Sequence, residues 1–143
     1  MPYKYLEDVA IADVAFEAWG ATLEELFTAA AEATMNIMVA DLATITSGEK
    51  RKIALEEENL DLLLFNFLQE LVFYKDAERL LLRVAKVRIE QGDGIVRVEA
   101  ELYGEELNPR KHDLGVDVKA ITLHQFQVEH SAGAWRANVI VDV

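Results

Sequence analysis

A broad apolar stripe at helical spacing in the middle of the chain constrains the fold most strongly. Asn59 can cap a helix that runs to about Lys75. The apolar residues of this segment are Leu60, Leu63, Leu64, Phe67, Leu68, Leu71 and Val72, and they follow the period of an α-helix. Because the stripe is broad, we expect this helix to be buried against a sheet.

A second helix is predicted over residues 22–40. Thr22 and Glu25 have the spacing of a capping box, in which each side chain satisfies a free N–H at the start of the helix. The apolar residues that follow keep a roughly helical spacing up to Met38. The chain therefore has two long helices, separated by a turn at Ser47–Gly48 and a possible edge strand over residues 51–57.

The remaining segments have the alternation of strands. Residues 80–89 and 95–103 form a predicted hairpin around the turn 91–94. Short strands are predicted at 3–6 and 14–19, and two late strands at 120–129 and 134–143 are joined by residues 130–133. We expect a single domain over residues 1–143 of the α+β class, with two layers: a mostly antiparallel sheet covered on one face by the two helices.

The charge of the chain restricts its partners. The 143 residues include 14 Lys and Arg against 26 Asp and Glu, a formal net charge of −12. Tight binding to nucleic acid requires clustered basic residues, so we expect no direct tight nucleic-acid binding. An acidic surface suits metal cations or a basic protein partner, although solubility alone is an equally good explanation.

The same composition bears on location and chemistry. The chain has no cysteine, which excludes disulfides, thiolate zinc sites and cysteine nucleophiles. We expect a cytoplasmic protein without membrane association, because neither a signal-like start nor an apolar run of membrane length is present. Phosphate-binding and nucleophile-elbow motifs are also missing.

Histidines and the polar segment 105–117 are weaker candidates. His112 and His124 lie in segments that look structured, but a lone histidine is more often a surface residue or a satisfied core residue than a ligand. The polar segment carries Asn108–Pro109 and is predicted to be an ordered loop or a short helical turn, which makes it a candidate functional loop.

Two aspartates stand out because they are isolated among apolar or small residues. Asp13 lies between Ala12 and Val14, and Asp142 lies between Val141 and Val143. An ionised carboxylate in such a setting is costly unless it is paired or coordinated. A hard divalent cation (Ca²⁺, Mg²⁺ or Mn²⁺) would explain both, because these ions bind carboxylate and carbonyl oxygens. For Asp13, a helix or turn cap is the alternative.

Two further residues could add oxygens to this metal site. Val143, written as the last residue, could contribute its main-chain carboxylate beside Asp142. Asp41 follows the predicted first helix and could reach the same place, but a turn residue is the favoured interpretation there.

The segment 119–124 supplies candidate partner contacts. In a strand, Lys119 shares one face with Ile121 and Leu123, while Thr122 and His124 share the other face with Ala120. The polar side chains among these, Lys119, Thr122 and His124, could contact a partner or a phosphate. Cross-strand pairing within the sheet is the alternative.

The ordered set of these motifs resembles the archease family over nearly the whole length. The set comprises Ala12–Asp13, Gly20 with the Leu23–Phe27 helix start, Gly104–Glu105, Asn108–Pro109 with His112, the segment Lys119–His124, and Asp142. The chain departs from the family pattern at Ala10 and Ile11, where the family usually has His-Thr, and at Leu123, where Tyr is common.

The resemblance implies a function. Archeases are accessory proteins of the RNA-splicing ligase (RtcB type) that joins tRNA halves; they accelerate its guanylylation and allow multiple turnover. By this resemblance the chain is a non-catalytic ligase activator, with a metal site at Asp13 and Asp142. A general chaperone or modulator with structural acidic residues is the main alternative, and a small metal-dependent hydrolase is a third.

Overall fold

The computed structural model describes residues 2–6 and 13–143. Ala10 and Ile11, where the chain departs from the family pattern, lie outside the described residues. The strands are β1 Tyr3–Leu6, β2 Asp13–Gly20, β3 Glu49–Glu57, β4 Leu80–Gly92, β5 Ile95–Glu106, β6 Ala120–Ser131 and β7 Ala134–Asp142. The helices are α1 Leu23–Met38 and α2 Leu60–Glu78, and a short 3₁₀ helix, η1, spans Leu42–Thr44.

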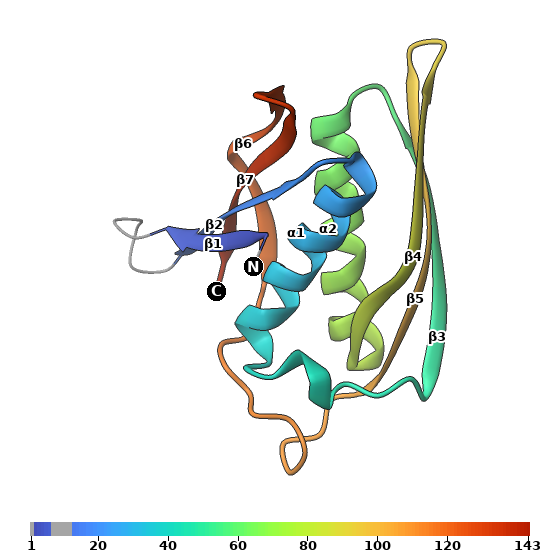
Figure 1. Ribbon diagram of the computed structural model, residues 1–143. Coiled ribbons are helices and arrows are strands. Elements are labelled where there is room, and N and C mark those ends of the chain that lie inside the picture. Colours follow the sequence, from blue (N-terminus) through green and yellow to red (C-terminus); the bar gives the residue numbers. More distant parts are fainter. Residues whose placement is uncertain (1, 7–12) are drawn as a thin grey trace.

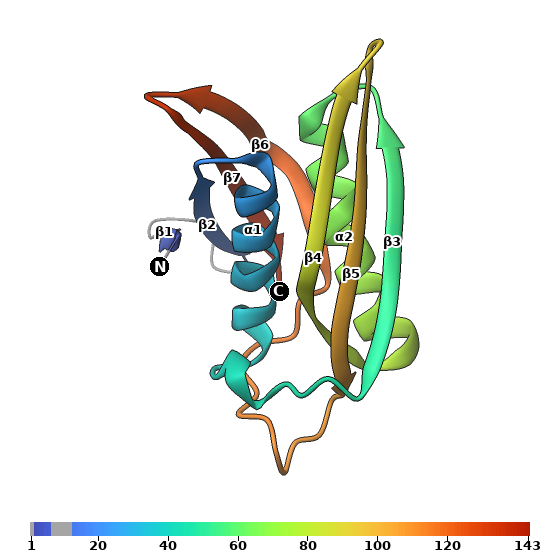
Figure 2. The ribbon, with the colours of Figure 1, turned by 45° about the vertical axis from the view of Figure 1, so that its right-hand side comes forward.

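The described strands form two antiparallel sheets instead of the one that was expected. The first sheet has the order β1-β2-β7-β6, and the second has the order β3-β5-β4. Figures 1 and 2 show α1 and α2 lying between the two sheets, so the domain has three layers. The α+β class, the two long helices and the antiparallel pairing are confirmed; the two-layer arrangement with one sheet is wrong.

The burial of both helices explains the third layer. In α2, Leu63, Leu64, Phe67, Leu68 and Leu71 are fully buried, and this stripe is too wide for a single sheet to cover. In α1, the small residues Ala29, Ala30, Ala31 and Ala33 are buried, which lets the helix approach its neighbours closely. Each helix therefore packs against both sheets, and the core is continuous through the helical layer.

The caps predicted for the two helices are present. Thr22 Oγ1 accepts a hydrogen bond from the Glu25 N–H at 3.1 Å, while Glu25 Oε2 accepts from the Ala21 N–H at 2.7 Å. Asn59 Oδ1 accepts from the Leu62 N–H at 2.9 Å. These bonds satisfy N–H groups that have no partner inside the helix.

The helix ends differ by a few residues from the prediction, because C-terminal signals are weaker. Helix α1 ends at Met38, before the predicted Ala40, and Val39 is extended. Helix α2 runs past the predicted Lys75 to Glu78 and is ended by Arg79, whose φ of 56° is left-handed.

Two tight turns fix the registers of the hairpins. Asp93–Gly94 joins β4 to β5 and Ala132–Gly133 joins β6 to β7, and all four residues have positive φ. This is the conformation of the two-residue turns that match the twist of a hairpin. The predicted hairpin of β4 and β5 and the predicted connection between the two late strands are both confirmed.

The polar segment predicted as a loop is anchored to both helices. The Gly115 and Val116 N–H groups donate to the carbonyls of Met38 and Ile37 at the end of α1, at 2.8 and 3.0 Å. At the end of α2, Lys75 is only 7% exposed, and its Nζ donates to the Val118 carbonyl at 2.7 Å and to Asp117 Oδ1 at 2.7 Å. These bonds place the start of β6.

Side chains from the helices cover N–H groups at two sheet edges. Asp61 and Gln69 of α2 accept from the N–H groups of Val128 and Ile121 in β6, at 2.7 and 3.0 Å. Glu24 of α1 accepts from the Ile89 N–H in β4 at 2.9 Å. Of the helices that the structure describes, none combines the length and the apolarity needed to span a bilayer.

Candidate metal centre

Asp13 and Asp142 are direct cross-strand neighbours. Asp13 begins β2, Asp142 ends β7, and the two residues pair in the antiparallel register. Paired residues in neighbouring strands project from the same face, with roughly 5 Å between their Cβ atoms. The two aspartates that the sequence singled out separately, at opposite ends of the chain, therefore lie side by side.

The pair lies on the face of the first sheet that is turned away from the helices. The neighbouring pairs Val14–Val141 and Phe16–Val139 have at least one fully buried member in the core, and side chains alternate along a strand. Asp13 and Asp142 consequently project to the opposite face, where both are half-buried. A cation can reach them there without crossing the core.

Like charges directly opposite each other in a ladder destabilise it. Among the residues that the structure describes, neither carboxylate has a side-chain hydrogen bond or an ion pair. A divalent cation would supply the missing counter-charge with the oxygen ligands that it prefers. The donor set thus fits a hard cation, although a group of three or more His, Asp or Glu side chains is not found among the described residues.

Val143 follows Asp142 directly, and its side chain packs against the core. Because a valine side chain has no ligand atom, this residue could offer only main-chain oxygens to a cation beside Asp142.

Asp41 lies in a turn, as the favoured interpretation predicted. It caps η1: its Oδ1 accepts from the Ala43 N–H at 3.0 Å, and its carbonyl accepts from the Thr44 N–H at 3.1 Å. A carboxylate that completes its own turn in this way is engaged locally.

Lys119 and Thr122 lie near the carboxylate pair, whereas His124 lies in the irregular stretch of β6 between Thr122 and Gln127. The Lys119 N–H donates to the Asp142 carbonyl at 2.9 Å, and Ala120 pairs with Asp142. Thr122 pairs with Ile140, on the same face as Asp142, but its hydroxyl donates to the Ile140 carbonyl at 3.1 Å. For Thr122, the cross-strand alternative therefore describes the contact that is present.

The expected alternation of this segment stops after Thr122. The β6–β7 register shifts between Thr122 and Gln127, and Gln125 has a φ of 54°. Leu123 is 57% exposed whereas Ile121 is buried, and His124 is also exposed. The irregular pairing leaves Leu123 and His124 at the surface of β6, and the face that Leu123 shares with Ile121 stays a prediction.

His112 is a satisfied core residue. It is 2% exposed, its Nδ1 accepts from the Asn108 N–H at 2.9 Å, and its Nε2 lies 3.0 Å from Glu105 Oε2. Because Nδ1 accepts a backbone N–H, the ring carries its proton on Nε2 and donates it to Glu105. The interpretation of this histidine as a satisfied core residue is confirmed.

Glu105 is the acceptor at the centre of this cluster. Burial acts to raise its pKa, but hydrogen bonds from Lys111, the Thr46 N–H and His112 outweigh this and hold the pKa at about 2. Glu105 therefore stays ionised and joins the polar segment to residues before β3.

Sequence reasoning missed Lys75. This residue interrupts an apolar stripe one turn after Leu71 and Val72, and a charged residue at a core position is the signal that could have revealed it. By holding Asp117 and Val118, it sets the position from which β6 approaches Asp142.

The fold and the carboxylate pair define a small acidic α+β protein with two sheets around a helical layer and a candidate cation site on one sheet. The Archease protein family (MTH1598/TM1083) matches residues 3–143. The chain belongs to the archease family.

Relatives and solved structures agree with this assignment. The chain is 38% identical over 133 residues to the protein archease of Thermococcus kodakarensis, covering 92% of this chain and 93% of the relative. It is 33% identical over 144 residues to that of Methanosarcina mazei, covering 99% and 95%. The solution structure of Methanobacterium thermoautotrophicum protein 1598 has a TM-score of 0.85 at 32% identity, covering 99% of both chains.

A more distant structure is similar in fold. It is the crystal structure of an archease from Thermotoga maritima, described as a possible chaperone, with a TM-score of 0.60 at 20% identity. The match covers 94% of this chain and 93% of that one.

Proposed function

We propose that this chain is an accessory protein that activates an RtcB-type RNA-splicing ligase in the cytoplasm during tRNA splicing. It promotes guanylylation and multiple turnover of the ligase and performs no catalysis itself. The observation that carries the proposal is the cross-strand pairing of Asp13 with Asp142 in a chain of the archease family.

Asp13, Asp142 and the main-chain oxygens of Val143 would hold a divalent ion, Ca²⁺, Mg²⁺ or Mn²⁺. Such an ion supplies positive charge and exchangeable oxygen coordination at a protein surface. The two strands fix the separation of the carboxylates, and the bond from Lys119 to the Asp142 carbonyl fixes the end of β7. The ligase would bind its own GTP and RNA, consistent with the net charge of −12 on this chain.

The test uses isosteric variants. Asp13→Asn and Asp142→Asn keep the shape and remove one charge, and Asp41→Asn is the matched control because asparagine also caps helices well. We expect the first two to reduce Mn²⁺ or Ca²⁺ affinity in calorimetry by at least tenfold and to abolish stimulation of ligase guanylylation. Asp41→Asn should retain both, and full stimulation by folded Asp142→Asn would refute the mechanism.

A general chaperone is the second candidate, favoured by exposed apolar side chains. Phe73 of α2 and Leu123 of β6 are each 57% exposed, and Val116 is 52% exposed. Suppression of the aggregation of an unrelated unfolding protein, lost in Phe73→Ser with Leu123→Ser but kept in Asp142→Asn, would support this role over the ligase-specific one.

A further inference from the structure

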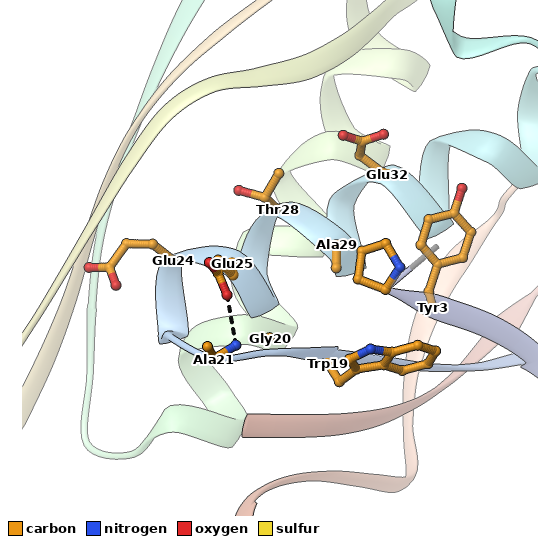
Figure 3. A pocket seen from close by; sticks show the side chains of 10 residues that line it. Tyr3, Trp19, Gly20, Ala21, Glu24, Glu25, Thr28, Ala29 and Glu32 are labelled. Atoms are coloured by element: carbon orange, nitrogen blue, oxygen red, sulfur yellow. Dashed lines mark hydrogen bonds between the residues drawn. The ribbon is translucent and has the colours of Figure 1, made fainter. Parts of the chain in front are cut away.

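A preformed groove lies along the first half of α1, beside the strand ends of the first sheet. It encloses about 570 Å³, between Tyr3 and Trp19 on the strand side and Glu25, Thr28, Ala29 and Glu32 on the helix side. Figure 3 shows Trp19 and Tyr3 along one border and the residues of α1 along the other. We call this space the α1 groove.

The walls of the α1 groove are held by contacts that leave its shape little freedom. A Cβ added at Gly20 would lie 2.6 Å from Glu25 Cβ, so only glycine lets the end of β2 approach the start of α1 this closely. The Trp19 N–H donates to the Pro2 carbonyl at 2.8 Å, and the Tyr3 hydroxyl donates to Asn36 Oδ1 at 3.1 Å. A ligand therefore meets a site that is already formed.

The chemistry of the α1 groove combines aromatic surface with carboxylates. Helix α1 carries Glu24, Glu25 and Glu32 and has neither Lys nor Arg. Among the described residues, Glu32 is paired with Arg83 of β4, whose Nη2 lies 3.1 Å from Glu32 Oε2. The carboxylates of Glu24 and Glu25 accept only uncharged backbone N–H groups, so the lining of the α1 groove keeps an excess of negative charge.

This combination selects a class of partner. An anionic partner would be repelled by the glutamates. A purely apolar side chain could use the rings and Ala29 but would leave the excess negative charge of the groove unneutralised. Arg and Lys side chains have apolar stems and cationic heads that interact favourably with both aromatic faces and carboxylates.

We infer that the α1 groove docks a basic segment of the protein partner, with Arg or Lys side chains seated between the strand-end aromatics and the glutamates of α1. This inference rests on the proposed function in identifying the partner as the ligase. It adds a contact that is separate from the Asp13–Asp142 pair, since the groove lies at the opposite end of β2 from Asp13.

The direct test requires no ligase. A short synthetic peptide of alternating arginine and leucine is titrated into the isotopically labelled chain at about 0.15 M salt, where charges farther apart than about 8 Å are largely screened. We expect amide shifts concentrated at residues 19–32, and none with the glutamate–leucine counterpart. Shifts spread evenly over the acidic surface would overturn the inference.

Thr28→Lys is the decisive variant, and Gln127→Lys is its matched control. Lysine favours a helix and would place a positive charge inside the α1 groove, while exposed Gln127 accepts the same change on β6. We expect Thr28→Lys to weaken peptide binding at least tenfold and Gln127→Lys to change it less than twofold. Equal weakening would overturn the inference, and Thr28→Leu, which fills the groove without charge, provides the same test if Thr28→Lys does not fold.

The ligase distinguishes this inference from the proposed function. Thr28→Lys should weaken association with the ligase while leaving Mn²⁺ affinity unchanged, whereas Asp142→Asn should lose Mn²⁺ affinity and keep peptide binding. Normal ligase association by Thr28→Lys would overturn the assignment of the groove to the ligase without bearing on Asp142.

Discussion

Asp13 stands directly opposite Asp142 in the ladder between β2 and β7, although 128 residues separate the two in the sequence. The repulsion between these carboxylates lowers stability when no cation is bound. Removing one charge should therefore stabilise the chain under those conditions.

We predict that Asp142→Asn raises the free energy of unfolding by roughly 0.5 kcal/mol in chelator and low salt. Urea denaturation measures this difference. Millimolar Ca²⁺ or Mn²⁺ should make the wild type the more stable of the two proteins, because only the wild type gains binding free energy. Asp41→Asn should change little in either condition. A loss of stability in chelator for Asp142→Asn would contradict the prediction.

Lys75→Met should lower the free energy of unfolding by about 1–3 kcal/mol, because the bond to Val118 and the pairing with Asp117 are lost while the apolar stem is kept. The cost stays below that of a fully buried pair because the side chain of Asp117 is 67% exposed and remains hydrated. Chemical denaturation measures it, with exposed Lys52→Met as the control, and equal effects of the two would be evidence against the anchoring role.

Glu105→Gln should make the free energy of unfolding depend less on pH in the acid range. The folded pKa of about 2 lies below the ordinary value of 4.5, so the carboxylate stabilises the fold above about pH 4.5 and loses this effect as the pH falls toward 2. We expect the variant to be about 1–2 kcal/mol less stable than the wild type at pH 6 and nearly equal to it close to pH 2. A gap that stays constant across this range in denaturant titrations would exclude the charge as the cause.

Gly20→Ala should destabilise the chain by about 1–3 kcal/mol, because the new methyl group would meet the Glu25 Cβ and the backbone of Leu26. Gly92→Ala is the matched control, since a Cβ there has no neighbour within 4 Å. Thermal unfolding compares the two, and similar melting temperatures would show that the start of α1 can move away.

Local sequence patterns predicted the elements well. The capping spacing of Thr22 and Glu25, the stripe of α2 and the turn at Asp93–Gly94 each depend on nearby residues, so the sequence carries them directly. The chemical isolation of Asp13 and Asp142 was also visible, because an unpaired carboxylate among apolar residues is costly in any fold.

The relative placement of segments that are distant in the chain could not be predicted from the sequence. That β3 pairs with β5 instead of joining the first sheet depends on which strands meet after the helices pack, and this produced the second sheet. The contacts of Lys75 likewise join residues that are far apart in sequence. The irregularity after Thr122 depends on pairing with β7, which periodicity alone does not reveal.

The helix side chains that accept N–H groups of β6 and β4 also limit self-association. A strand edge with free N–H groups can recruit a second chain and extend the sheet from molecule to molecule. The side chains of Asp61, Gln69 and Glu24 accept hydrogen bonds from such N–H groups and bring polar or charged groups to those edges. At these two edges, intermolecular sheet growth would first have to break hydrogen bonds within the monomer, so the chain can reach high concentration with less risk of polymerising through them.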